Sequence, residues 1–329
     1  MKILHVLISR VSLPPVKYGG TQRVIWALAQ AQQDQGHEVR FLWGDAPSVP
    51  PGTTIAKKGQ ALDPLIGDWP DIVHFHRAPD EAISKPFVVT EHFNAGGPQT
   101  YHQNTIFLSR QHASIHNAQR YVYNGLNWAD YGKPEYSPTG KYLHFLGKAR
   151  VATKNLSGAI DVARQAGQKL AVLGGPRIKL GRGGYIHFAR NVSFKGMVGG
   201  ETKNNLIRQS QGLLLPVRWH EPFGLAYTES LYLGCPVFAT PYGAIPEIVS
   251  EPEAGFLSAS GAELAEAITN LSGYNRRLCH ELAVERFGHQ QMAKGYEACY
   301  QQVLDGQPLH QNAPYATEDL TALLPFTAQ

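Results

Sequence analysis

Two glutamates lie close together in the stretch HEPFGLAYTESLYLGCPVFATP, which runs from residue 220 to residue 241. Glu221 precedes a Pro-Phe-Gly segment that ends the apolar run 212–217, and Glu229 lies among leucines in a helix expected from about Gly224. The helical part of their separation is roughly 7–8 Å, about the span of a diphosphate. Because one carboxylate can accept hydrogen bonds from both hydroxyls of a vicinal diol, the spacing predicts one glutamate on a sugar and Glu229 on the ribose of a nucleotide.

Two lysines, Lys148 and Lys154, follow the apolar run 142–147 in the stretch FLGKARVATKN. Two cations on one loop suit a diphosphate leaving group, because their attraction for it grows as negative charge develops in the transition state. The start of the helix near Gly224 adds backbone N–H groups that can bind phosphate. A pair of solvated surface lysines is the alternative that these residues alone leave open.

A pair of glycines, Gly19 and Gly20, lies in the stretch YGGTQ between the apolar run 2–8 and a helical pattern. Glycines at a strand-to-helix turn let an anionic ligand approach backbone N–H groups closely. A tight turn with no ligand is an equally good explanation of the pair.

Histidines end two of the expected strands. His74 and His76 alternate along the run 71–76, and His92 ends the run 86–92. A His-x-His pair on a strand points both rings to one face and raises the question of zinc, but no carboxylate or cysteine completes a ligand set at a suitable spacing. We therefore expect no metal, and we expect His92 to be a hydrogen-bonding group over the ligand cleft. Five other histidines could line the ligand-binding face of the same domain or be polar surface residues, and we expect the second: His74, His76, His102, His112 and His116.

The chain alternates short apolar runs with amphipathic patterns. Strands are predicted at residues 2–8, 38–44, 71–76, 86–92, 105–109 and 120–124, and again at 142–147, 169–175, 191–198, 212–217 and 236–240. Helices are predicted from Gly20 to about Gly36 and at residues 154–166, 201–210, 224–234, 244–249 and 261–306. This alternation predicts an α/β protein with two Rossmann-like, doubly wound parallel-sheet domains that face one another across a cleft.

Turn residues divide the chain. An N-terminal domain is expected at residues 1–125, a linker rich in glycine and proline at 126–140, and a C-terminal domain at 141–305. The tail 306–329 is expected to pack back on the N-terminal domain. Ligands of such sheets bind at the carboxyl ends of the strands, so the candidate residues should gather there.

Composition excludes several classes of protein. The 329 residues carry a formal net charge of +4 without a basic stripe, which argues against nucleic-acid binding. No apolar window of about 18 residues is present that could span a membrane. The three cysteines are an odd number without framework spacing, so we expect reduced thiols and a cytoplasmic location. Peripheral contact with the inner face of a membrane stays open.

Several of these stretches together resemble the retaining glycosyltransferases of family 4. The block beginning HEPFGLAYTES is similar to the E-x7-E signature of that family, including the run GAIPEIV at residues 243–249. YGGTQRV looks like its first glycine loop, DIVHFH and VVTEH like its histidine-bearing strands, GK-x5-K like its two-cation loop, and VSFKGMV like the strand beside the base. The resemblance covers nearly the whole chain and implies a GT-B fold.

The resemblance also implies a role for each candidate residue. Glu221 would contact hydroxyls of the donor sugar and Glu229 the ribose, while His92 would orient the donor sugar and the acceptor. Lys148 and Lys154 would grip the diphosphate. Backbone groups would help to bind the donor at Gly19, Gly20, Met197, Val198, Phe223, Gly224 and Leu225. The reaction would retain configuration through attack on the same face of the sugar, with no essential metal and no cofactor.

The sequence departs from the family pattern in three places. Lys148 stands where arginine is usual and so lacks the bidentate fork, and Asn155 replaces the usual glycine after the second lysine. The first domain is short between His76 and His92, where acceptor-binding loops normally lie. The class of acceptor is therefore left open among glycans, lipids and small molecules.

We thus expect a retaining glycosyltransferase of the hexosyltransferase type that uses a nucleotide-diphosphate sugar. A nucleotide-sugar epimerase of the same fold is one alternative, although it needs an acid and a base on opposite faces of the sugar ring. A catalytically silent nucleotide-sugar-binding subunit is the other alternative. The sugar, the base, the acceptor and the oligomeric state are not determined by the sequence.

Overall fold

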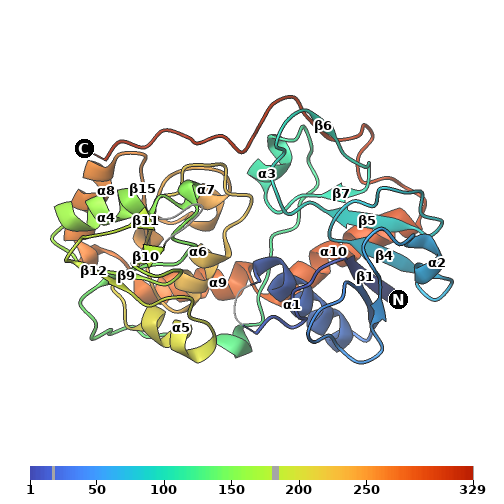
Figure 1. Cartoon of the computed structure of the whole chain (residues 1–329), viewed down its shortest axis with the longest axis horizontal. Helices are drawn as coiled ribbons and strands as arrows, with labels where there is room; N and C mark the ends of the chain where they lie inside the picture. Colours follow the sequence, from blue (N-terminus) through green and yellow to red (C-terminus); the bar gives the residue numbers. More distant parts are fainter. Residues whose placement is uncertain (17–18, 180–184, 329) are drawn as a thin grey trace. The chain divides into compact units, whose positions relative to one another are not determined.

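The computed structural model describes residues 1–16, 19–179 and 185–328. The chain forms two compact units (Figure 1). Unit 1 consists of Met1–Asn127 and Phe287–Leu320, and unit 2 consists of Trp128–Arg286 and Thr321–Gln329. The chain therefore passes from one unit to the other three times.

Unit 1 is built on six parallel strands in the order β3-β2-β1-β4-β5-β7. The strands are β1 (Lys2–Leu7), β2 (Glu38–Trp43), β3 (Thr54–Ile55), β4 (Ile72–Phe75), β5 (Phe87–Thr90) and β7 (Thr105–Ile106). The helices are α1 (Gly20–Asp34), α2 (Asp63–Ile66), α3 (Arg110–Ser114) and α10 (His289–Leu304). A short antiparallel pair, β6 (Gln99–Thr100) with β16 (Tyr315–Ala316), attaches the segment after α10 to this unit.

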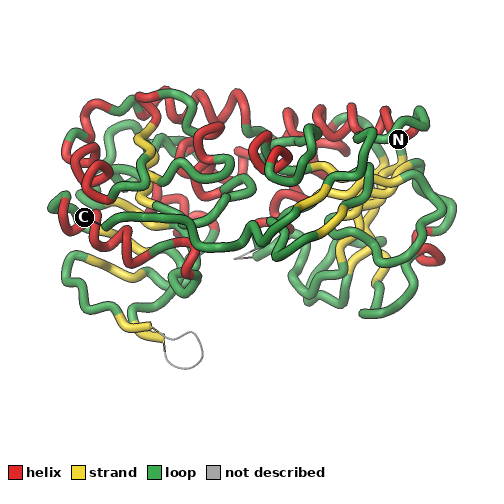
Figure 2. Tube along the Cα trace, turned by 90° about the horizontal axis from the view of Figure 1, so that it is seen from above, coloured by secondary structure: helices red, strands yellow, loops and turns green. Residues whose placement is uncertain are grey.

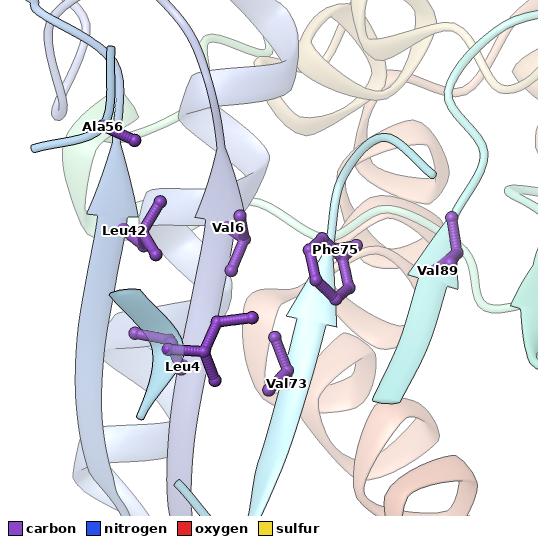
Figure 3. Close-up of a cluster of buried hydrophobic side chains, with 8 residues drawn as sticks. Leu4, Val6, Leu42, Ala56, Val73, Phe75 and Val89 are labelled. Atoms are coloured by element: carbon purple, nitrogen blue, oxygen red, sulfur yellow. The ribbon is translucent and has the colours of Figure 1, made fainter. Parts of the chain in front are cut away.

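The two faces of this sheet bury different side chains. One face carries aliphatic and aromatic residues from neighbouring strands, among them Leu4, Val6, Val73 and Phe75 (Figure 3). Successive residues of a strand point to opposite faces, so His5 and His74 lie on the other face. Helices α1 and α10 contact each other, and α10 also packs against β5.

Unit 2 is built on six parallel strands in the order β12-β9-β8-β13-β14-β15. The strands are β8 (Leu143–Phe145), β9 (Leu170–Val172), β12 (Val192–Phe194), β13 (Leu213–Leu215), β14 (Val237–Ala239) and β15 (Gly255–Leu257). The helices are α4 (Leu156–Gln165), α5 (Gly200–Arg208), α6 (Leu225–Tyr232), α7 (Ile245–Ile248), α8 (Gly261–Thr269) and α9 (Arg276–Arg286). Short 3₁₀ helices are η1 (Trp128–Tyr131), η2 (Ala152–Lys154), η3 (Pro252–Ala254) and η4 (Leu271–Gly273).

A separate antiparallel hairpin of unit 2 lies outside this sheet. It consists of β10 (Ile178–Lys179) and β11 (Tyr185–Ile186), and Figure 2 shows its two short strands away from the parallel ones. The sequence predicted no strand in this segment.

The predicted α/β class with two parallel sheets is confirmed. Numbered within its own unit, each sheet has the order 3-2-1-4-5-6, which is that of Rossmann-type sheets. The predicted strand 120–124 is wrong: it contributes only an isolated bridge between Phe107 and Tyr121. A strand at 255–257 was not predicted.

The C-terminal part of the chain differs from the sequence-based division. The predicted helical stretch 261–306 is three helices, and the last of them, α10, belongs to unit 1 rather than to the domain proposed at 141–305. Of the tail 306–329, residues up to 320 lie in unit 1, but the last residues lie in unit 2, where Leu324 N–H donates to Arg218 O at 2.8 Å. The predicted linker 126–140 belongs to unit 2 from residue 128 onward.

Two further findings concern thiols and membrane spans. Cys235, Cys279 and Cys299 are free thiols and all three are buried. Within the described ranges, no helix combines the length and the apolar character that crossing a membrane requires.

Candidate functional site

Glu221 follows β13 and is held from three directions. Lys154 Nζ lies 2.6 Å from Glu221 Oε2, and the indole Nε1 of Trp219 donates to the same oxygen at 2.9 Å. Ala244 N–H donates to the carbonyl of Glu221 at 2.9 Å. The neighbouring Gly243 has a φ of +66°, and a Cβ there would overlap the backbone of Glu221. The chain can therefore approach Glu221 this closely only with glycine at position 243.

Lys148 and Lys154 lie on the loop after β8, as predicted. The loop rests on the end of β9, because Ala149 N–H donates to Gly174 O at 3.0 Å and a Cβ on Gly174 would overlap the carbonyl of Gly147. Partial burial, and then the nearby Arg150, lower the pKa of Lys148. Lys154 stacks its ammonium over the indole of Trp219, with Nζ 5.3 Å from the ring centroid.

Asn155, which follows the second lysine, adopts a backbone conformation that favours glycine. Its φ of 55° and ψ of 50° lie in the left-handed region, which asparagine enters more readily than most residues. Its Oδ1 accepts from Gly158 N–H at 3.2 Å and caps α4, and its Nδ2 donates to Pro216 O at 2.9 Å. Asn155 thus links the loop of Lys148 and Lys154 by a hydrogen bond to the residue that follows β13.

Glu229 lies on α6 and is buried together with its partners. Oε2 lies 2.6 Å from Lys203 Nζ on α5, and Oε1 accepts from Tyr131 Oη of η1 at 2.9 Å. Glu229 and Lys203 expose only 6% and 8% of their surface. Lys203, Tyr131 and Trp219 are site residues that sequence reasoning missed, and neither their types nor their spacing marked them in advance.

The start of α6 has the form expected of an anion site. Gly224 has a φ of +105° and precedes Leu225, and no described side chain caps the helix. Phe223 is buried beside it. Unpaired N–H groups at a helix start attract negative charge, so this end of α6 suits a phosphate.

Met197 and Val198 follow β12. The Met197 side chain is 45% exposed. Val198 lines an open cavity of about 580 Å³ whose other lining residues are Lys195, Glu201, Thr202, Asn205 and Leu206. The predicted base-contacting segment therefore borders a cavity within unit 2.

The glycine pair of unit 1 stands at the start of α1. Gly19 precedes the helix with a φ of +152°, and the helix begins at Gly20. Gln22 of the same turn donates to Ser9 Oγ, which follows β1, at 3.1 Å. Tyr18, the first residue of the predicted glycine loop, lies outside the described residues.

His92 follows β5 and is buried. Burial lowers its pKa to about 4, so the ring is neutral at physiological pH. The loop after it is fixed by α3 and the residues that follow: His112 Nε2 lies 3.1 Å from Phe93 O, and Ala95 N–H donates to His116 Nε2 at 3.3 Å.

The predicted surface location of the other histidines is wrong for four of the five. His74, His76, His112 and His116 are buried, whereas His102 is exposed. The ring nitrogens explain how they can be buried, because each of the four rings has hydrogen-bond partners through both nitrogens. His5 on β1 was not among the predicted candidates. One of its ring nitrogens, one of His74 and one of His76 all lie within 4.8 Å of one another.

The structure therefore brings together Lys154 with Glu221, and it pairs Glu229 with a lysine that was not predicted. In unit 2 the candidate residues Lys148, Met197 and Glu221 all follow strands at the carboxyl edge of the sheet, and in unit 1 His92 does the same. Ligands of Rossmann-type sheets bind at this edge.

The whole chain is similar in fold to solved glycosyltransferases. AviGT4, a glycosyltransferase involved in avilamycin A biosynthesis, superposes with a TM-score of 0.73 at 22% identity over 93% of this chain and 99% of that chain. HepE from Anabaena, solved in complex with UDP and glucose, has a TM-score of 0.65 at 16% identity over 92% and 100% of the two chains. The chain has the GT-B fold.

Sucrose-phosphate synthase from Thermosynechococcus elongatus shares this GT-B fold, with a TM-score of 0.70 at 15% identity over 93% of this chain and 100% of that one. Within the GT-B chain, residues 140–273 match the family model of the glycosyl transferases group 1. This segment contains both lysines of the two-cation loop and both glutamates. No curated protein matches the chain in sequence.

Proposed function

We propose that the chain is a retaining glycosyltransferase of the family 4 type, which moves a sugar from a nucleotide-diphosphate sugar to a hydroxyl acceptor. The observation that carries the proposal is the pair of Lys154 and Glu221, with Nζ 2.6 Å from Oε2, beside the start of α6, which no side chain in the described part of the chain caps. A cation, a carboxylate and helix N–H groups are the groups that a sugar diphosphate needs. The group 1 family match over residues 140–273 supports the same function.

The leaving diphosphate is assigned to the cations of unit 2. Lys154 has three N–H donors, so it can contact a phosphate oxygen while it keeps Glu221. Lys148 and the N–H groups of Phe223, Gly224 and Leu225 add positive potential, and we assign the same task to Gly19 and Gly20 in unit 1. These groups stabilise charge that increases as the glycosidic bond breaks, so their effect is largest in the transition state.

Glu221 is assigned to the donor sugar and Glu229 to the ribose. Lys154 and Trp219 both contact Oε2 of Glu221, which leaves Oε1 for sugar hydroxyls. Glu229 already accepts from Lys203 and Tyr131, and a ribose would use the remaining lone pairs of its carboxylate. Met197 and Val198 are assigned to the base, and His92 to the reacting sugar and the acceptor hydroxyl.

Retention follows if the acceptor hydroxyl attacks the face of the sugar that the diphosphate leaves. The departing phosphate oxygen then takes the proton of the acceptor, so no covalent enzyme intermediate is needed. Since lysines and helix N–H groups neutralise the diphosphate in this scheme, we propose that the reaction requires no metal and no cofactor.

Donor binding and donor hydrolysis test the proposed function together. The protein is heated with UDP-, GDP-, ADP- and TDP-sugars, with and without EDTA, and release of the nucleoside diphosphate is measured. We expect one nucleotide to raise the melting temperature selectively and its sugar to be hydrolysed slowly in the presence of EDTA. Binding without release, even with a panel of glycan and lipid acceptors, would favour a silent binding subunit. No response to any donor would refute the proposal.

Replacing Lys154 by alanine is expected to lower turnover of that donor by about 10²-fold or more, because the charge that stabilises the departing diphosphate is lost. The rate is measured at saturating donor. Lys141→Ala, which removes an exposed lysine of the same unit, is the matched control and should leave the turnover unchanged. Nearly normal turnover in Lys154→Ala would show that this lysine is only a structural partner of Glu221.

We also propose that unit 2 contacts anionic membrane surfaces peripherally. Between Asp161 and Glu201 the sequence has seven lysines and arginines and no acidic residue. In the same stretch the hairpin pairs Ile178 with Ile186, which are 52% and 49% exposed, and Phe188 follows at 85%. Exposed apolar side chains flanked by basic ones suit the interface of an anionic bilayer.

Phe188→Ser is expected to weaken cosedimentation with phosphatidylglycerol vesicles several-fold, because it removes apolar area that the bilayer would bury. Zwitterionic vesicles should bind poorly throughout. Ile55→Ser, a change at an exposed residue of unit 1, is the control. Equal binding to both kinds of vesicle, or none, would contradict the membrane contact.

A further inference from the structure

A line of hydrogen-bonded side chains runs through unit 1 from α1 to His92. Gln32 Oε1 on α1 lies 2.7 Å from His5 Nε2. His5 Nδ1 lies 3.0 Å from His76 Nε2, and His76 Nδ1 lies 3.2 Å from His92 Nε2. All four side chains are buried, so water does not compete for these bonds. Gln32 and His92 are thus connected through two other rings.

In such a line, each neutral ring must donate a hydrogen bond in the same direction along the line. Burial lowers the pKa of His5 to about 4, and burial followed by the neighbouring rings lowers that of His76. A neutral imidazole has one N–H and one lone pair, so a ring that donates through one nitrogen must accept through the other. The tautomer of the first ring therefore determines the tautomer of the last.

The amide of Gln32 sets the direction. Its Oε1 can only accept, so His5 carries its proton on Nε2 and accepts on Nδ1 from His76 Nε2–H. His76 in turn accepts on Nδ1 from His92 Nε2–H. His92 is left with a lone pair on Nδ1, and that nitrogen can accept a hydrogen bond from a hydroxyl but cannot donate one to a phosphate or carbonyl oxygen.

A second branch from the same amide agrees with this direction. Gln32 Nε2 donates to Tyr300 Oη on α10 at 3.0 Å, and Tyr300 Oη lies 2.7 Å from His74 Nδ1. His74 Nε2 lies 2.7 Å from Thr90 Oγ1, and Thr90 donates to Tyr296 Oη at 3.0 Å. Turning the amide of Gln32 by half a turn would reverse every bond in both branches. The orientation of one side chain thus decides the tautomer of all four histidines.

We propose that Gln32 is a positioning residue that fixes His92 as the Nε2–H tautomer, so that His92 presents an acceptor nitrogen to a substrate hydroxyl. The substrate part rests on the proposed function, in which His92 meets the reacting sugar and the acceptor. The tautomer part rests only on the contacts inside unit 1.

Zinc is the competing explanation of the same cluster. His5, His74 and His76 each bring one ring nitrogen within 4.8 Å of the others, and three histidines can hold zinc. However, all six ring nitrogens of these residues already have partners among Gln32, Thr90, Tyr300 and the other rings. Binding zinc through one nitrogen of each ring would break at least two of these hydrogen bonds, so we assign the cluster to the hydrogen-bonded line.

The test is the nitrogen NMR spectrum of the histidine rings in the full-length protein labelled with ¹⁵N-histidine. Long-range proton–nitrogen correlations distinguish the two neutral tautomers of each ring. We expect His5, His74, His76 and His92 all to be Nε2–H, with unchanged signals on addition of zinc. An Nδ1–H form of His92, or zinc-dependent shifts shared by His5, His74 and His76, would overturn the proposal without any variant.

Gln32→Met removes both the acceptor and the donor at nearly constant volume. We expect the His92 signals to change from one tautomer to a mixture, whereas Gln33→Met, on the exposed side of α1, should leave them unchanged. An unaltered His92 in a folded Gln32→Met variant would refute the role of Gln32.

Where a donor is turned over, Gln32→Met should lower kcat/KM by about 10-fold, the value of roughly one hydrogen bond. If the tautomers are as expected but no donor reacts, the proposed function fails and the positioning of His92 by Gln32 stands.

Discussion

At pH 4.5 unit 1 is expected to be largely unfolded, although it is folded at pH 7. The cause is the set of neutral histidines buried in this unit. Burial lowers the pKa of His5 and of His92 to about 4, whereas a histidine in an unfolded chain has a pKa of about 6.5. As the pH falls from 6.5 towards 4, the unfolded chain therefore binds protons that the folded unit does not. The contribution of these neutral rings to the free energy of unfolding is therefore complete above pH 6.5. It is lost progressively as the pH falls from 6.5 towards 4.

The size of the effect follows from proton linkage. Each such ring lowers the free energy of unfolding by at most about 1.4 kcal/mol per pH unit, and by less near either pKa, so His5 and His92 together remove about 4 kcal/mol between pH 6.5 and 4.5. That is comparable with the whole stability of many domains, which is about 5–15 kcal/mol. His74, His76 and His112, whose pKa values burial also lowers, act in the same direction.

Circular dichroism against pH measures the transition, and hydrogen exchange at the amides of β1 and β4 assigns it to unit 1. His92→Gln should make the dependence on pH less steep, because one titrating ring is removed. His102→Gln, which changes an exposed histidine, should alter the slope less. A free energy of unfolding that stays constant between pH 6.5 and 4.5 would contradict this account of the buried rings.

Lys203→Met is expected to destabilise unit 2 by about 3–5 kcal/mol, because it leaves the carboxylate of Glu229 buried without its cation. The pair is nearly closed to solvent, and its two charged atoms are 2.6 Å apart. Tyr131→Phe removes the hydrogen bond from an uncharged hydroxyl to Oε1 of the carboxylate and should cost less, about 1.5–3 kcal/mol. Urea unfolding of the unchanged protein, Lys203→Met and Tyr131→Phe gives the three free energies of unfolding to be compared.

The double variant Lys203→Met, Glu229→Gln separates this structural role from ligand binding. It removes both charges, so most of the lost stability should return. If Glu229 also holds the ribose, the refolded double variant should bind the donor more weakly but turn over bound donor at a similar rate, since a ribose contact is similar in the ground and transition states. Lys169→Met, at an exposed lysine, is the control. Equal stability of Lys203→Met and this control would show that the pair contributes nothing.

Much of the fold could be predicted from local patterns. Strands of a parallel sheet are buried on both faces and read as continuous apolar runs, so β1, β4, β8 and β13 fall inside the predicted runs. Of the two-residue strands, β7 falls inside the predicted run 105–109, whereas β3, β6, β10, β11 and β16 gave no such signal. The pairing of Lys154 with Glu221 was also foreseeable in outline, because both follow strands at the carboxyl edge of one sheet.

The histidine line could not be predicted in the same way. Alternation of His74 and His76 with apolar residues is the usual pattern of a strand with one face in water. That face is covered by α1 and α10, and α10 comes more than two hundred residues later, so no local pattern reveals the cover. Tyr300 and Gln32, which are 268 positions apart, make the burial possible by supplying partners for the rings.

The partner of Glu229 was missed for a related reason. Lys203 lies on α5 between acidic and polar neighbours and reads as a solvated lysine of an amphipathic helix. Only the packing of α5 against η1 brings it beside Tyr131 and excludes water. A carboxylate in an apolar run indicates that a partner exists, but the sequence does not say which cation is that partner.

The three passages of the chain between the units affect how the protein can be dissected. A contiguous fragment 1–127 has the sheet of unit 1 but lacks α10, and with it Tyr296 and Tyr300. A fragment 128–286 lacks the residues beyond 320 that hydrogen-bond to Arg218 and Ala259. Chimeras that exchange acceptor or donor specificity with a relative must therefore move residues 1–127 together with 287–320, as one discontinuous module.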